Sequence, residues 1–310
     1  MLSRIAESLF WIGRYVERAD DTARILDVHV ERSLDDPWLD EATVCRALMG
    51  VMGVPDDGVD PTRARLLARL AHDAVDPSSV AGAIGAAREN ARRARETVSS
   101  EVWEGLNTTW LSIASGRWTT VSAHRYCNWV RERTAVVSGL VDSTMSRDES
   151  WHFLVLGRSL ERADMTARLL TTGTLHGAGP TWPTLLRSCG AYEAFLRTYS
   201  GSALGAAGEE QAAEFLLLDR LFPRSVLNAL TTAEASLEAL EPQDPRGVRS
   251  EDAHRILGRA RTELQYAGDL LQRLPEHMAR VQAACSAAAE AVGRRFFPLV
   301  GATSWVEADA

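Results

Sequence analysis

One segment of fourteen residues occurs twice in this chain, at a constant offset of 144 positions. The first copy, GRYVERADDTARIL, spans 13–26, and the second copy, GRSLERADMTARLL, spans 157–170. Ten of the fourteen positions are identical, and the match needs no gap. Two copies are too few for a solenoid of stacked repeats. We therefore predict an internal duplication into two halves, about 1–144 and about 145–310, which pack with a pseudo-twofold relation as one domain.

Each copy has apolar residues at helical spacing, which predicts a long helix with one face in the core. These residues are Ile12, Val16, Ala19, Ala23 and Leu26, and in the second copy Leu156, Leu160, Ala163, Ala167 and Leu170. A second stripe beside the first carries glycine and charged residues. Its members are Gly13, Glu17, Asp20 and Arg24, and in the second copy Gly157, Glu161, Asp164 and Arg168. The arginines that flank this stripe are Arg14, Arg18, Arg158 and Arg162.

The charged stripe has two interpretations that the sequence does not separate. The glutamates and arginines can form a buried ion-pair network that fixes how the two halves dock. They can also form one shared ligand site on the pseudo-twofold axis, because these charges are unchanged in both copies whereas a solvated face would have drifted. Arginine binds carboxylate or phosphate, and an acidic side chain binds an amine, so an amino acid or a peptide terminus would fit. The matched glycines predict a close backbone approach or a ligand.

Several kinds of site can be argued against. The spacing Glu17-x-x-Asp20, repeated as Glu161-x-x-Asp164, resembles carboxylate pairs in di-iron bundles, but those bundles use Glu-x-x-His and the neighbouring arginines here would compete with a cation. The motifs GxxxxGK[ST], GxGxxG and GxSxG are absent from the sequence, so nothing supports nucleotide binding or an α/β-hydrolase. We expect no metal site and no cofactor.

No run of alternating β-branched residues predicts a strand, so the fold class is all-α, a multi-helix bundle of about ten to twelve helices. Clusters of glycine, proline and aspartate separate the helical segments. The predicted helices span about 2–34, 40–50, 61–74, 78–98, 118–143, 146–175, 183–200, 209–220, 249–272 and 275–296, with others opening at the Ser99 cap and at Pro223.

Composition narrows the class of protein. A formal charge of −8 argues against a nucleic-acid partner, which requires a basic surface. Four cysteines without paired spacing predict buried, reduced thiols. Charged residues interrupt the apolar N-terminus, and no apolar run reaches about 18 residues, so we expect neither a signal peptide nor a membrane span. A cytoplasmic location is the default expectation.

Three stretches of the chain resemble a known family. MLSRIAESLFWIGRYVERADDTARIL, DSTMSRDESWHFLVLGRSLERADMTARLL and FLLLDRLFPRSV are similar to the bacterial alpha-E family, and the resemblance covers essentially the whole chain. It implies an all-α fold in which Glu17 and Glu161 are the natural functional glutamates. It also implies partners, because members are usually encoded beside, or fused to, a circularly permuted ATP-grasp protein and a transglutaminase-like cysteine peptidase.

The resemblance therefore implies a role in ATP-dependent amide or peptide synthesis, and three functions remain open. The chain can be an accessory or substrate-binding subunit whose Arg/Glu/Asp cleft binds a zwitterionic or carboxylate ligand. It can be an enzyme of the same pathway, with Glu17 or Glu161 as general acid or base. It can also be a structural scaffold. A cleft lined by both stripes would favour the first two functions, and stripes fully paired to each other would favour the third.

Overall fold

The computed structural model describes residues 1–35, 40–55, 58–59, 61–173, 181–199, 206–241 and 253–298. Within these ranges the backbone forms thirteen α-helices, one π-helical turn and one 3-10 turn, and no strand. The all-α prediction is therefore confirmed. The predicted number of helices is slightly low, partly because the segment 183–200 forms two helices. They are separated at Gly190, whose positive φ of 63° is a common way to end a helix.

The helices up to residue 144 are α1 (Ser3–Asp35), α2 (Glu41–Val51), α3 (Arg63–Leu67) with the π-turn Ala68–His72, α4 (Val80–Arg93), α5 (Ser100–Ala114), the 3-10 turn Arg117–Thr120 and α6 (Ala123–Thr144). The helices after it are α7 (Glu149–Gly173), α8 (Trp182–Ser188), α9 (Tyr192–Thr198), α10 (Ala206–Leu218), α11 (Val226–Leu240), α12 (Ala253–Tyr266) and α13 (Leu274–Phe296). Serine caps begin several of them. The hydroxyl of Ser99, for example, accepts the backbone N–H of Val102 at 3.1 Å, as predicted for the start of α5.

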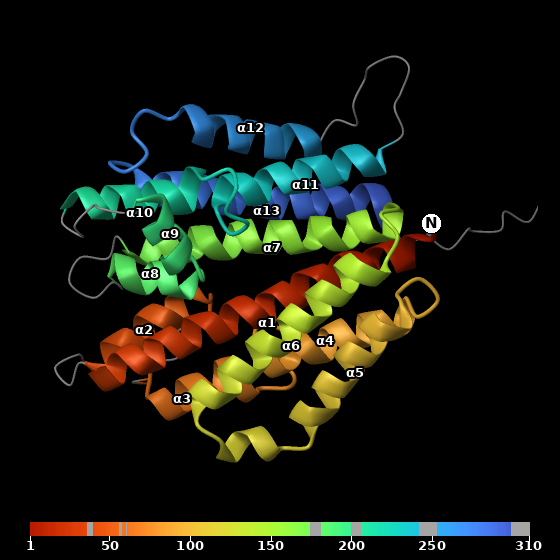
Figure 1. Ribbon diagram of the computed structural model, residues 1–310, viewed down its shortest axis with the longest axis horizontal. Helices are drawn as coiled ribbons and strands as arrows, with labels where there is room; N and C mark the ends of the chain where they lie inside the picture. The colour runs from red at the N-terminus through yellow and green to blue at the C-terminus, as the bar shows by residue number, and fades with distance from the viewer. Residues whose placement is uncertain are drawn as a thin grey trace, which may run out of the picture.

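The two repeat-bearing helices, α1 and α7, lie at the centre of the molecule and run in the same direction (Figure 1). α4 and α6 pack against α1, whereas α11 and α13 pack against α7. The other helices thus cover the central pair from two sides. This burial on all sides explains why the charged stripe of each repeat lies inside the protein together with the apolar stripe.

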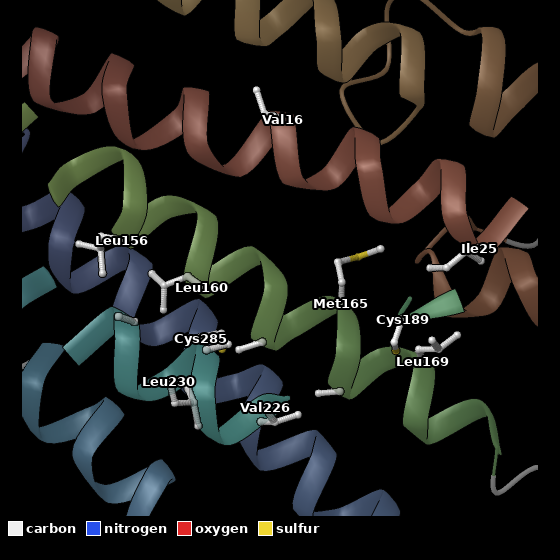
Figure 2. Close-up of a cluster of buried hydrophobic side chains, with 14 of the residues drawn as sticks. Val16, Ile25, Leu156, Leu160, Met165, Leu169, Cys189, Val226, Leu230 and Cys285 are labelled. Atoms are coloured by element: carbon white, nitrogen blue, oxygen red, sulfur yellow. The ribbon is translucent and has the colours of Figure 1, made fainter. Parts of the chain in front are cut away.

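Both predicted apolar stripes are buried in the core, and each of their ten residues is at most 6% exposed. Most of the core is one cluster that contains residues of both halves. Figure 2 shows part of it, where Leu156 and Leu160 of α7 lie near Leu230 of α11 and Cys285 of α13. All four cysteines are buried and free, as the sequence predicted. Within the described residues, every helix is too short or too polar to span a bilayer.

The two repeat glycines mark the closest approach of α1 and α7. A β-carbon on Gly13 would overlap the carbonyl oxygen of Leu154, and a β-carbon on Gly157 would overlap the carbonyl oxygen of Phe10. Phe10 and Leu154 are themselves 144 positions apart, so the two contacts are reciprocal. The prediction of a close backbone approach at these glycines is confirmed.

Candidate functional site: two exchanged Glu-Arg clusters

Glu161 of α7 lies between two arginines of α1. Its Oε2 accepts a hydrogen bond from Arg14 Nε at 2.6 Å and from Arg18 Nη2 at 3.0 Å, and its Oε1 accepts one from Arg18 Nε at 2.5 Å. The guanidinium of Arg14 lies over the ring of Trp11, and that of Arg18 over the ring of Tyr15. Glu161 is only 1% exposed, so a buried carboxylate of the second repeat is held by the first repeat.

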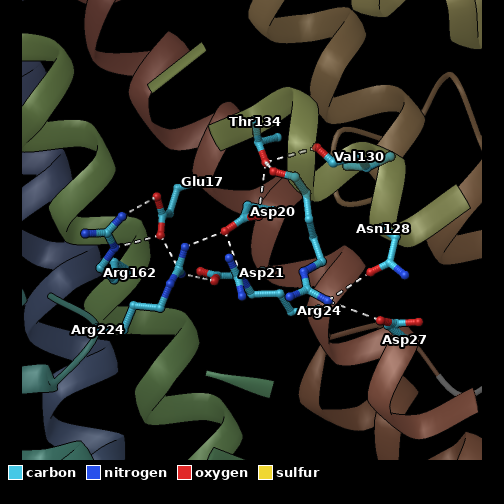
Figure 3. A network of polar contacts seen from close by, with 11 residues as sticks. Glu17, Asp20, Asp21, Arg24, Asp27, Asn128, Val130, Thr134, Arg162 and Arg224 are labelled. Carbon is cyan, nitrogen blue, oxygen red and sulfur yellow. Dashed lines mark hydrogen bonds and ion pairs between the residues drawn. The ribbon is translucent and has the colours of Figure 1, made fainter. Parts of the chain in front are cut away.

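Glu17 of α1 is held in the reverse sense (Figure 3). Arg162 of α7 binds both carboxylate oxygens, at 2.7 and 2.8 Å. Arg224, in the turn before α11, forms an ion pair with Glu17 at 2.6 Å. Arg224 also donates hydrogen bonds to Asp20 and Asp21. Three carboxylates of the first repeat therefore share an arginine that lies outside both repeats.

The arginines set the ionisation state of both glutamates. Burial by itself would raise the pKa of Glu17, but Arg162 and Arg224 outweigh it and lower the pKa to about 2. Burial also opposes ionisation of Glu161, and Arg14 and Arg18 again outweigh it, so its pKa is lowered. Both glutamates are ionised near pH 7.

The two remaining acidic residues of the predicted stripe are paired within their own helices. Arg24 Nε donates to Asp20 Oδ2 at 2.8 Å, and Arg168 Nε donates to Asp164 Oδ2 at 2.7 Å. The other oxygen distinguishes the two aspartates. Oδ1 of Asp20 accepts a hydrogen bond from Thr134 at 3.0 Å, whereas Oδ1 of Asp164 is buried without a partner among the described residues.

The structure does not bring all predicted residues into one site. The hydrogen bonds of the described residues form two clusters, around Glu161 and around Glu17, and each cluster combines side chains of both repeats. The predicted stripe residues therefore form two ion-pair clusters, and the single shared ligand site on the pseudo-twofold axis stays a prediction. Arg158 belongs to neither set of bonds. Its one ion pair within the described residues joins it to Asp142 at 3.7 Å.

The profile of the Alpha-E family matches residues 1–297 and is described as a predicted alpha-helical domain with a conserved ER motif. The chain belongs to the Alpha-E family. The sequence contains four Glu-Arg dipeptides, and two of them, Glu17-Arg18 and Glu161-Arg162, occupy matching positions of the repeated segment. The four side chains of these two dipeptides form the exchanged pairs.

The relatives found among curated proteins carry no assigned activity. Uncharacterized proteins of Mycobacterium bovis and Mycobacterium tuberculosis are each 24% identical to this Alpha-E chain over an alignment that covers 76% of it. The alignment spans 30% of each mycobacterial protein, so the relatives are much longer than the matched part. No solved structure matches the chain.

Arg224 is a member of this Alpha-E site that the sequence analysis missed, although a second repeat marks it. The pattern D-x-x-x-P-x-S-V occurs at 73–80 and again at 219–226, at an offset of 146. In both turns the aspartate accepts backbone N–H groups, and the serine caps the next helix. Arg224 occupies the position that Ser78 occupies in the first turn.

Asp21 is the other residue of this site that the sequence analysis missed. Like Arg224, it is charged, whereas the corresponding residue of the other half is not. Its counterpart in the second repeat is Met165. The hydrogen-bonded pair Asp21–Arg224 thus corresponds to the positions of Met165 and Ser78, where neither residue carries a charge. Both partners of this hydrogen bond are therefore missing from the corresponding positions of the other half. The sequence contained this signal, but it links residues 203 positions apart.

The residues of the Glu17 cluster do not fit a metal ion. Carboxylate oxygens of Glu17, Asp20 and Asp21 lie within 4.8 Å of one another, which is a spacing that a metal could use. The guanidinium of Arg224 bonds to all three and already takes the place of a cation. Because arginine keeps its charge in proteins, a metal ion here would meet a buried like charge.

Asp21 has the most perturbed environment of the three carboxyls. Burial raises its pKa to about 8, against the pull of Arg224 and with the help of the neighbouring charges of Glu17 and Asp20. Its Oδ2 and the hydroxyl of Ser188 have no hydrogen-bond partner among the described residues. Both residues line a cavity of about 10 Å³, which is close to the room that one water molecule needs.

Proposed function

We propose that this chain is a non-catalytic accessory subunit of an ATP-grasp-dependent system that forms or modifies amides or peptides. The family resemblance supports the partners, a circularly permuted ATP-grasp protein and a transglutaminase-like peptidase. The length of the mycobacterial relatives supports a domain that works beside other domains. The proposal includes a cytoplasmic location, where ATP is supplied.

The exchanged pairing, in which the glutamate of each repeat is bonded to arginines of the other, is the observation that favours an accessory subunit over an enzyme. A general acid or base works best with a pKa near the operating pH. The pKa of Glu17 is about 2 and that of Glu161 is also lowered, so neither carboxylate can accept or release a proton readily near pH 7. All four of their oxygens are already bonded to arginines. We therefore assign the glutamates to docking the two halves of the body.

The ligand of the proposed subunit is an amino acid or a peptide with a free carboxylate. Arg158 supports this choice, because within the described residues its one ion pair is the 3.7 Å contact with Asp142. The purely structural scaffold remains the second candidate. The same exchanged pairing favours it, since two glutamates whose four oxygens are all bonded to arginines need no ligand to explain them.

An assay with the neighbouring ATP-grasp protein separates these functions. That protein would be purified and its ADP release followed with and without this chain, across a panel of amino acids and short peptides. We expect ADP release to need this chain, and to persist with a folded Glu17→Gln variant. Loss of turnover in a Glu17→Gln variant of native stability would instead favour the enzyme. Equal ADP release with and without the chain would leave the scaffold as the better account.

A further inference from the structure

Arg158 lacks the partner that its counterpart has. Arg14, at the corresponding position of the first repeat, donates a 2.6 Å hydrogen bond to the glutamate of the other repeat, Glu161. The equivalent partner of Arg158 would be Glu17. Both oxygens of Glu17 are already bonded to Arg162, and Arg224 forms a further ion pair with it at 2.6 Å.

The presence of Arg224 explains this difference between the two copies. The turn before α4 has Ser78 where the turn before α11 has Arg224, so no additional cation competes with Arg14. In the other cluster Arg224 supplies the cation that Arg158 would otherwise provide. The second repeat has an arginine at this position, as the first repeat does. The carboxylate that would accept its hydrogen bond, Glu17, is instead bonded to Arg162 and paired with Arg224.

Arg158 is consequently a poorly neutralised cation. Its side chain is only 15% exposed, and its nearest carboxylate, Asp142, is 3.7 Å away, 44% exposed and shared with Arg147. Burial lowers the pKa of Arg158, and the positive charge of Arg162 lowers it further. Arg158 donates no hydrogen bond within the described residues, although a guanidinium offers five donors. Its nitrogens are not among the buried polar atoms that lack a partner, so the guanidinium reaches solvent. A weakly neutralised cation that solvent can reach favours an incoming anion.

We propose that Arg158 binds the oxyanion of a carboxylate or phosphate ligand, beside Arg162 and the turn that precedes α11. Arg162 lies one helical turn along α7 and donates a long hydrogen bond to the carbonyl of Pro223 in that turn. A guanidinium matches the two oxygens of a carboxylate or phosphate with a pair of parallel hydrogen bonds. This inference rests on the proposed function for the identity of the ligand, because it locates the carboxylate of that ligand, but it can be tested on the chain alone.

Calorimetric titration of the purified chain at low ionic strength tests the site, with glutarate and inorganic phosphate as separate probes. We expect wild type to bind at least one of them and Arg158→Gln to bind it about tenfold or more weakly, as the loss of a charge-assisted pair predicts. Arg147→Gln is the matched control, because Arg147 shares Asp142 but is 59% exposed, and it should bind as wild type does. Binding of glutarate alone would indicate a carboxylate ligand, and binding of phosphate alone a phosphorylated one.

Two further variants make the test stricter. Asp142→Asn removes the one competing carboxylate and should strengthen binding. The double variant Asp21→Met/Arg224→Ser gives the Glu17 cluster the residues of the other half, so Arg158 should return to Glu17 and anion binding should fall. Absence of binding to wild type, or equal binding by wild type and Arg158→Gln, would overturn the anion site. Neither outcome bears on ADP release by the partner, so the failure of this site can be distinguished from the failure of the proposed function.

Discussion

The cluster around Glu161 holds one carboxylate between two arginines, whereas the cluster around Glu17 holds three carboxylates among three arginines. Both are built on the same fourteen-residue repeat, and both bury their glutamate almost completely. The difference arises from two positions, Asp21 instead of Met165 and Arg224 instead of Ser78. The two copies of the segment thus form equivalent central ion pairs, and the additional pair Asp21–Arg224 in one half accompanies a different set of contacts for Arg158.

The largest expected loss of stability comes from substituting the two glutamates, and the two losses should differ. Glu161→Gln should lower the free energy of unfolding by about 3–5 kcal/mol, because it removes a buried carboxylate and leaves the partly buried Arg14 and Arg18 without their partner. Glu17→Gln should cost less, about 1–3 kcal/mol. In that variant Asp21, whose pKa falls once Glu17 is gone, can ionise and balance Arg224. Urea unfolding at pH 7 measures both, and a larger loss for Glu17→Gln would contradict the comparison.

Arg14 and Arg158 occupy equivalent positions of the two repeats, and their substitutions should give the next largest difference in stability. Arg14→Gln removes a hydrogen bond to buried Glu161 and should lower the free energy of unfolding by about 1.5–3 kcal/mol. Arg158→Gln removes a cation that neighbouring cations repel, and at low salt it should leave stability unchanged or raise it. The pair would be compared by urea unfolding at two salt concentrations. Equal destabilisation by the two substitutions would mean that Arg158 is bonded as Arg14 is.

The crossing of α1 and α7 is where the two repeats should behave alike. Gly13→Ala and Gly157→Ala each place a methyl group on a backbone carbonyl of the other helix, so each should lower the free energy of unfolding by about 1–3 kcal/mol. Gly139→Ala in α6 is the control, because its β-carbon would meet open space, and it should stabilise by about 0.5–1 kcal/mol. If only one of the two repeat glycines tolerated alanine, the crossing would not be reciprocal.

Stability should also depend on pH through Asp21, which has no acidic counterpart in the other repeat. The folded-state pKa of Asp21, about 8, lies above the ordinary value of 3.8, so the folded state holds a proton that the unfolded state has released between these values. The contribution of Asp21 to stability is therefore lost as pH rises from about 4 to 8. Asp21→Asn should flatten this slope in thermal unfolding measured from pH 5 to pH 8, and Met165→Leu in the other repeat should leave it unchanged. A slope that is identical in Asp21→Asn and wild type would show that Asp21 is ionised throughout.

Much of the arrangement followed from the sequence. Hydrophobic periodicity predicted the long helices and the buried face of each repeat, because a 3.6-residue period gathers apolar side chains on one side. The matched glycines predicted the close crossing, since glycine inside a helix needs such a reason. The repeated segment identified Glu17 and Glu161 as candidate functional residues, and the family resemblance pointed to the same two glutamates.

The exchange of partners was decided only by tertiary structure. At i+3 and i+4 spacing the sequence allowed Arg14 to pair with Glu17 in its own helix. The parallel contact of α1 and α7 instead places the glutamate of each repeat beside the arginines of the other. Periodicity along one helix specifies which side chains share a face, but it carries no information about the helix that will meet that face. For the same reason the sequence alone did not reveal that Arg224, from a turn 203 residues after Asp21, would enter one cluster and leave Arg158 without its glutamate.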